Sequence, residues 1–245
     1  MMQARCSSRA YGHDSSIVYF SSSMFNLFFH ALVKYLLGVV LVGVLLFVPA
    51  GTLHFWQAWL FMAVLFLPML VTGIVLMCIN PALLRRRLDA KEKESEQKIV
   101  VAMGGLLFVA MFVTAGLNHR FHWWMLPDGL VMTASLVFLF GYAMYAEVMR
   151  ENVWLSRTIE VQEDQQVVDK GLYGVVRHPM YAATLLLFLT APLILASGWS
   201  LLIMLLYIPI VVKRIRNEEK VLEQELTGYE EYKRRVRWRL IPWIW

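Results

Sequence analysis

Long uninterrupted runs of apolar residues constrain this chain more than any other feature of its sequence. Four of them are each about as long as the roughly 20 helical residues needed to cross a hydrocarbon core of about 30 Å. They lie at residues 25–50, 55–79, 99–117 and 126–146. With 59% hydrophobic and only 17% charged residues, a soluble chain of this length could not cover its surface with polar groups. The sequence therefore predicts an all-α integral membrane protein, a polytopic helical bundle.

The positions of Lys and Arg decide how a fifth apolar run, at residues 182–212, is expected to fold. Basic residues of a membrane protein are concentrated in its cytoplasmic loops. The net charge of +5 is therefore interpreted as an excess of cytoplasmic Lys and Arg and not as a sign of nucleic-acid binding. A single crossing would leave the nine basic residues after position 212 outside. A hairpin at Ser197-Gly198 instead places 22 of the 23 basic residues on one side. We therefore expect about six membrane segments, with a C-terminal helical hairpin and a cytoplasmic amphipathic tail.

Three regions follow from this pattern. Residues 1–23 are polar and Ser-rich, and predict a flexible tail or a stretch that precedes a true start at Met24. Residues 24–149 hold four membrane helices, and residues 150–245 hold the polar segments, the hairpin and the tail. Both termini are predicted to be cytoplasmic, in a multi-pass protein of either a cell inner membrane or the endoplasmic reticulum.

A first polar stretch precedes the hairpin and contains Arg177-His178-Pro179. Proline is well suited to the first position of a helix, so a helix is expected to begin here with free N–H groups at the cytoplasmic mouth. Those groups, with Arg177 and His178, form a plausible site for a carboxylate or a phosphate. The alternative is an ordinary membrane boundary at which Arg177 anchors to lipid phosphate.

A second polar stretch follows the hairpin. Arg214 and Glu218 are four residues apart and so share one helical face. An apolar stripe at helical spacing accompanies them, formed by Ile215, Leu222, Leu226 and Tyr229. The pattern predicts that the last membrane helix continues as an amphipathic helix on the bilayer surface. The alternative is a solvated charged face with one small ion pair.

Together the two stretches resemble the isoprenylcysteine carboxyl methyltransferase family and the related membrane phospholipid methyltransferases. The resemblance covers about residues 150–245, which we interpret as a methyltransferase-like region with a cofactor loop. Its motifs are Gly171-x-Tyr173, Arg177-His178-Pro179-x-Tyr181, Glu218-Glu219-x-x-Leu222, Tyr229-x-x-Tyr232 and Arg239-Leu-Ile-Pro242. The first half of the chain matches only as hydrophobic spans.

The resemblance implies a binding site for S-adenosylmethionine. By position, its cofactor-binding residues would be Gln165, Gln166, Val167, Val168, Tyr173, His178, Pro179, Met180, Tyr181 and Glu218. Arg214 occupies the place of the family's contact with the substrate carboxylate, and is the predicted catalytic and substrate-binding residue. Two residues depart from the family's pattern. Gln165 stands where His is frequent, and Ala182 replaces a Gly, which is expected to tighten the cofactor pocket.

The physical chemistry of these residues suits that assignment. Tyr173 and Tyr181 offer aromatic faces to a sulfonium or an adenine, and Glu218 can accept from an ammonium or a ribose hydroxyl. A carboxylate acceptor is already ionised at pH 7 and needs no general base. No metal is expected, because the His119–His122 pair lies beside outer-loop tryptophans and is better interpreted as an interfacial cluster. The acceptor is expected to be lipophilic and to enter from the bilayer, among membrane lipids.

Three other functions compete with carboxylate methylation. A phospholipid N-methyltransferase would use the same cofactor on a lipid amine. An NADPH-dependent sterol or enone reductase has a related Arg-His-Pro element, but typically carries Asn before the Tyr and an acidic residue shortly after it. Met180 and Ala182-Ala183 stand there instead and favour the methyltransferase. A transporter or scaffold is disfavoured because no charged residue lies mid-span.

Overall fold

The computed structural model describes residues 11–88, 95–152, 154–155 and 161–245, and these residues are helical with connecting loops. The elements are α1 (Tyr11–Ala50), α2 (Trp56–Ile79), α3 (Pro81–Leu88), α4 (Ser95–Phe121), α5 (Asp128–Glu151), the 3₁₀ turn η1 (Gly171–Gly174), α6 (Pro179–Ile194), α7 (Gly198–Leu205), α8 (Tyr207–Glu225) and α9 (Tyr229–Arg235). Within the described segments, β pairing is limited to one isolated bridge between Met125 and Ser197. The all-α prediction is confirmed.

Five helical segments are long and apolar enough to cross a membrane. They are Met24–Ala50, Trp56–Ile79, Ala102–Phe121, Asp128–Glu151 and Gly198–Glu225. The four predicted N-terminal spans match the first four. The fifth joins α7 to α8, while α6 is a shorter apolar helix of 16 residues. Apolar side chains on the outside of these helices, such as Leu37 and Val40 of α1, are exposed as lipid contact requires.

Two predicted boundaries differ from the structure. Helix α1 already begins at Tyr11, so residues 11–23 are helical where a tail was expected, and residues 1–10 lie outside the described part of the chain. Extending an existing helix fixes only one more residue for each new hydrogen bond, which makes such an extension inexpensive. Helix α5 ends at Glu151 and packs along α6, so the regions on either side of residue 150 share one bundle.

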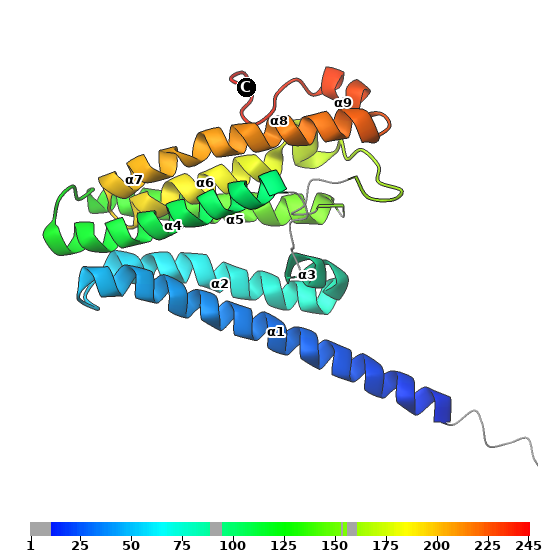
Figure 1. Ribbon diagram of the computed structural model, residues 1–245, viewed down its shortest axis with the longest axis horizontal. Coiled ribbons are helices and arrows are strands. Elements are labelled where there is room, and N and C mark those ends of the chain that lie inside the picture. Colours follow the sequence, from blue (N-terminus) through cyan, green and yellow to red (C-terminus); the bar gives the residue numbers. More distant parts are fainter. Residues whose placement is uncertain (1–10, 89–94, 153, 156–160) are drawn as a thin grey trace, which may run out of the picture.

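The predicted hairpin is present, with its turn at Leu195–Ser197. Ala196 takes a left-handed φ of 53°, and Ser197 caps α7 by accepting a hydrogen bond from the Ser200 N–H at 3.3 Å. Asn118 of α4 supports this turn, because it is fully buried and its side-chain amide donates to the Ala196 carbonyl at 3.5 Å. The arms α6 and α7–α8 return side by side along the bundle (Figure 1).

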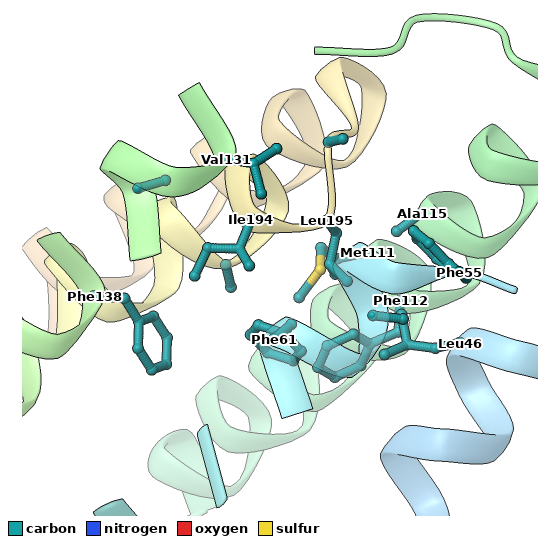
Figure 2. Close-up of a cluster of buried hydrophobic side chains, with 14 of the residues drawn as sticks. Leu46, Phe55, Phe61, Met111, Phe112, Ala115, Val131, Phe138, Ile194 and Leu195 are labelled. Atoms are coloured by element: carbon teal, nitrogen blue, oxygen red, sulfur yellow. The ribbon is translucent and has the colours of Figure 1, made fainter. Parts of the chain in front are cut away.

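The core lies where helices α1, α2, α4, α5, α6 and α7 meet. Phe61 of α2 contacts Phe112 of α4 and Phe138 of α5, with ring centroids 5.7 Å and 6.0 Å apart. Leu46 of α1 and Ile194 of α6 complete this cluster, and both are fully buried (Figure 2). Within a bilayer such packing stabilises the bundle through van der Waals contact between helices, because lipid tails are as apolar as the core side chains. The core therefore fixes α6 against the other helices and sets where its first residue points.

Polar segments gather at the opposite end of the bundle from the hairpin turn. In Figure 1, η1 and the loop before α6 lie near the end of α8 and near α9. After α9 the chain returns to α6, where the Arg177 N–H donates to the Trp238 carbonyl and the His178 N–H donates to the Arg239 carbonyl, each at 2.9 Å. We call this end of the molecule the polar end.

Candidate functional site

A cavity at the polar end is enclosed by the loop before α6, the first turn of α6, α8 and α9. Nearly all the predicted site residues line it: Gln165, Gln166, Val167, Val168, Tyr173, His178, Met180, Tyr181, Arg214 and Glu218. The cavity lining also contains Asn152, Trp154, Leu155, Arg177, Val221, Leu222, Leu226, Tyr229 and Tyr232. The structure thus brings together segments separated by up to about 80 positions in the sequence.

Helix α6 begins as predicted, with His178 at its N-cap and Pro179 at its first position. Pro179 is buried and starts the helix, while Met180 and Tyr181 after it face the cavity. The first N–H groups of any helix have no acceptor within that helix, so they are directed out of its N-terminus. Ala182 packs in the apolar cluster of Tyr181, Val211 and Ile215, so its extra methyl group adds to that cluster.

Four charged or polar side chains meet at the α6 end of the cavity. The Tyr181 hydroxyl donates to Glu218 Oε2 at 2.6 Å and accepts from Arg214 Nε at 3.0 Å. His178 Nδ1 lies 3.9 Å from Glu218 Oε1. The expected shared face of Arg214 and Glu218 is therefore present, and the hydroxyl of Tyr181 lies between the two side chains. Hydrogen bonds to charged groups are the stronger class, so the two bonds of the Tyr181 hydroxyl hold the Arg214 guanidinium and the Glu218 carboxylate in place.

The second glutamate of the Glu-Glu pair has a different environment from the first. The side chain of Glu219 is 4% exposed and accepts from Arg177 Nε at 2.8 Å and from Arg239 Nε at 2.7 Å. His178 Nε2 lies 3.3 Å from Glu219 Oε1. Arg177 also donates to the backbone carbonyls of Val236 and Arg237. Glu219 therefore ties α8, the start of α6 and the C-terminal segment together beneath the cavity.

The glycine of the Gly-x-Tyr motif is required by a close approach. Gly171 has a φ of +55°, and a Cβ atom there would lie 1.4 Å from Glu151 Oε1. Glu151, at the end of α5, accepts from the Leu172 N–H at 3.0 Å. This contact fixes η1 and directs Tyr173 inward, where the Tyr173 hydroxyl accepts from Asn152 Nδ2 at 2.9 Å. Position 171 requires glycine, because any side chain there would occupy the space of the Glu151 carboxylate.

The amphipathic stripe packs inside the protein. Ile215 is fully buried in the cluster with Tyr181, and Leu222, Leu226 and Tyr229 pack with Val167 from the loop before α6. Helix α8 runs without a break from Tyr207 through Lys213 to Glu225, so the helix extends past the end of the last apolar run. Its apolar face is covered by the loop and by α9, whereas the sequence had suggested the bilayer surface.

Gln165, which stands where the family frequently has His, does more than face the cavity. Its Oε1 atom accepts from the Gln162 N–H at 2.9 Å, and Gln162 Nε2 donates to the Trp154 carbonyl at 2.7 Å. These bonds shape the cavity wall from within the loop. Gln165 therefore hydrogen-bonds the backbone of its own loop.

Sequence reasoning did not assign a role to Asn152, Trp154, Glu219 or Tyr229. Asn152 lies shortly after a predicted span, and Tyr229 belongs to one of the motifs that carry the resemblance. Their positions in the sequence could therefore have indicated that both lie near the site. Among the described residues, no group of three or more His, Cys, Asp or Glu is placed to hold a metal ion. His119 stacks on Phe55 with ring centroids 4.0 Å apart, near the hairpin-turn end of the bundle.

Comparison with known proteins supports the resemblance drawn from the motifs. Residues 129–227 match the family model of phospholipid methyltransferases. No curated protein matches the chain. Among solved structures, the chain is similar to the eukaryotic intramembrane Ras methyltransferase ICMT (isoprenylcysteine carboxyl methyltransferase), with 19% sequence identity and a TM-score of 0.54. The match covers 96% of this chain and 89% of that chain. The predicted polytopic fold is therefore confirmed.

Proposed function

We propose that this protein transfers a methyl group from S-adenosylmethionine to a lipophilic carboxylate that reaches the site from the bilayer. The observation that carries the proposal is the single cavity into which the loop before α6, the first turn of α6 and α8 direct the motif residues. The match to phospholipid methyltransferases and the fold shared with an isoprenylcysteine carboxyl methyltransferase support the same reaction class.

The donor set of the cavity fits S-adenosylmethionine. Glu218 offers a carboxylate to the ammonium group, and the start of α6 offers N–H groups to the carboxylate. Tyr173 and Tyr181 present aromatic faces, and Val167 and Leu222 present apolar surface for an adenine ring. When bound, the cofactor would supply an electrophilic methyl group on a sulfonium sulfur. The residues of the chain would align that group and exclude water, and alignment is the main source of rate in such a displacement.

Arg214 is the proposed contact for the acceptor carboxylate. Its guanidinium borders the cavity and is held by the Tyr181 hydroxyl, one helical turn from Glu218. A planar guanidinium matches a carboxylate with two parallel hydrogen bonds, which also fixes the direction of the attacking oxygen. In the reaction a new O–CH₃ bond forms as the S–CH₃ bond breaks, and the leaving group is S-adenosylhomocysteine. A carboxylate has no proton to lose, so no general base is required.

The proposed orientation places the cavity on the cytoplasmic side. Residues 150–178 and 213–245 together carry 13 of the 23 basic residues, and basic residues concentrate on the cytoplasmic face of membrane proteins. A soluble, charged cofactor would then enter from the cytoplasm, while the acceptor's hydrocarbon part would stay in the bilayer.

Binding and transfer experiments test the proposal. Detergent-solubilised protein titrated with S-adenosylmethionine and, separately, with NADPH should bind only the former. His178→Ala and Glu218→Ala should each weaken S-adenosylmethionine binding without unfolding the protein. Binding of NADPH alone would refute the proposal and favour the reductase interpretation.

Arg214→Lys separates the acceptor from the cofactor. We expect methyl transfer to a carboxylate acceptor to fall far more than S-adenosylmethionine affinity, because a lysine ammonium cannot form the bidentate contact. A lipid amine is the second candidate acceptor, favoured by the match to phospholipid methyltransferases. A cation at position 214 would repel a protonated amine, so for that acceptor the loss should be small or reversed. Equal decreases in methyl transfer and in S-adenosylmethionine affinity would show that Arg214 does not contact the acceptor.

A further inference from the structure

Four tyrosine side chains line the cavity, and one of them differs from the other three. The hydroxyl of Tyr173 accepts from Asn152, and that of Tyr181 bonds Glu218 and Arg214. The hydroxyl of Tyr232 donates to the Tyr173 carbonyl at 2.8 Å. Tyr229 Oη, by contrast, is buried and has no hydrogen-bond partner among the residues that the structure describes. The Tyr229 residue as a whole is only 4% exposed.

An unsatisfied buried hydroxyl is costly, at about 1–3 kcal/mol. A phenylalanine would fill the same apolar space without that cost, so the hydroxyl needs a physical reason to be there. The reason does not lie in loose packing. Gly228, with a φ of +86°, turns the chain into α9, and the Tyr229 ring packs against Tyr232 with centroids 5.8 Å apart. The Tyr229 ring is therefore held in the cavity wall, and its buried hydroxyl has no partner among the described residues.

Burial and charge keep this hydroxyl protonated. Burial raises the pKa of Tyr229, and the carboxylates of Glu219 and Glu218 raise it further against the opposing charge of Arg177. At neutral pH the group is thus an O–H that can donate one hydrogen bond and accept another.

The cavity is charged near one end and apolar near the other. Along α8, Arg214 and Glu218 lie near the start of α6, whereas Leu222 and Leu226 lie toward α9. Glu218 and Leu222 are one helical turn apart, so Tyr229 packs with Leu222 while it stays within electrostatic reach of Glu218. Tyr229 belongs to the apolar cluster of Leu222, Leu226 and Val167. A ligand with a zwitterionic end and a flat aromatic end would place the aromatic end beside Tyr229.

From this placement we infer that the Tyr229 hydroxyl hydrogen-bonds the nucleobase of S-adenosylmethionine. The inference rests on the proposed function, and it adds a residue outside the segment that matches the phospholipid methyltransferase family. An adenine ring presents both nitrogen acceptors and an amino donor, and a neutral phenol can pair with either. The apolar side chains around the hydroxyl would cover the faces of the adenine ring, and the hydroxyl would hydrogen-bond the polar edge of that ring.

Tyr229→Phe tests the inference with two probes, S-adenosylhomocysteine and methylthioadenosine, which lacks the amino-acid end. We expect affinity for both probes to fall about 3–10-fold, the value of one hydrogen bond. Loss for S-adenosylhomocysteine alone would show that the hydroxyl contacts the amino-acid end and would overturn the nucleobase assignment. Unchanged affinity for both probes would overturn the contact altogether. Failure of the wild-type protein to bind either probe would instead refute the proposed function.

Thermal stability without ligand supplies a second readout and a matched control. Tyr229→Phe should unfold at the same temperature as the wild type or a higher one, because it removes an unsatisfied polar atom and keeps the ring. Tyr232→Phe should unfold at a lower temperature, because it removes a bond to the Tyr173 carbonyl. A clear loss of stability in Tyr229→Phe would show that a protein group already partners the hydroxyl, and would overturn the inference.

Discussion

Replacing Glu219 by Gln tests the ionic network that holds the cavity together. The wild-type carboxylate is 4% exposed and bonds two guanidiniums, those of Arg177 and Arg239. Glutamine keeps one oxygen for one guanidinium but turns an NH₂ group toward the other. It also leaves the charge of Arg177, whose side chain is 4% exposed, without its counter-ion. Removing one partner of a buried pair costs about 3–5 kcal/mol, because the remaining charge stays desolvated.

The expected loss is large enough for a thermal measurement. For a chain of this size, 1 kcal/mol shifts Tm by about 2–4 °C, so Glu219→Gln should lower Tm by about 10 °C in detergent. Glu230→Gln is the matched control. Glu230 faces Arg234 at 3.9 Å with both side chains more than 70% exposed, and such pairs contribute less than about 1 kcal/mol.

A double substitution separates the buried charge from a general loss of packing. The double variant Arg177→Met/Glu219→Leu removes both buried charges together. Its decrease in Tm should therefore be smaller than the sum of the decreases caused by Arg177→Met and Glu219→Leu separately. If Glu219→Gln unfolds at the temperature of Glu230→Gln, the network does not hold the three segments together, and this reasoning is refuted.

Two further predictions concern the hairpin and the topology. Gly198→Ala should destabilise the protein by about 1–3 kcal/mol in a thermal melt, because a Cβ there would lie 2.3 Å from the Trp124 ring. Gly105→Ala is the control and should be neutral or mildly stabilising, because a Cβ there would have no neighbour within 4 Å. In a cysteine-free background, single cysteines placed within residues 213–245 should react with an impermeant thiol reagent only from the cytoplasmic side; labelling from the outer side would contradict the proposed orientation.

Local sequence patterns were sufficient for the membrane architecture. The lengths of the apolar runs predicted α2, α4 and α5 to within a few residues at most ends, because the bilayer thickness fixes the length of a spanning helix. The charge distribution identified the hairpin near Ser197 before any contact was known. The Arg-His-Pro motif placed the start of α6 at Pro179, because proline strongly prefers that position.

The tertiary structure decided what each polar residue does. Glu218 and Glu219 are adjacent and chemically identical, yet one borders the cavity and the other lies buried between Arg177 and Arg239. Successive helical residues differ by about 100° in direction, and only the packing of the C-terminal segment against α6 determines which direction is the interior. The pairing of Asn152 with Tyr173 likewise depends on segments far apart in the chain. So does the burial of the Tyr229 hydroxyl, which has no partner within the part of the chain that the structure describes. The sequence by itself determined which segments enter the membrane, because that depends on composition over about 20 residues. Which side chains meet in the cavity was decided by contacts between distant segments, and the sequence indicated them only through the motifs that carry the family resemblance, not through composition or periodicity.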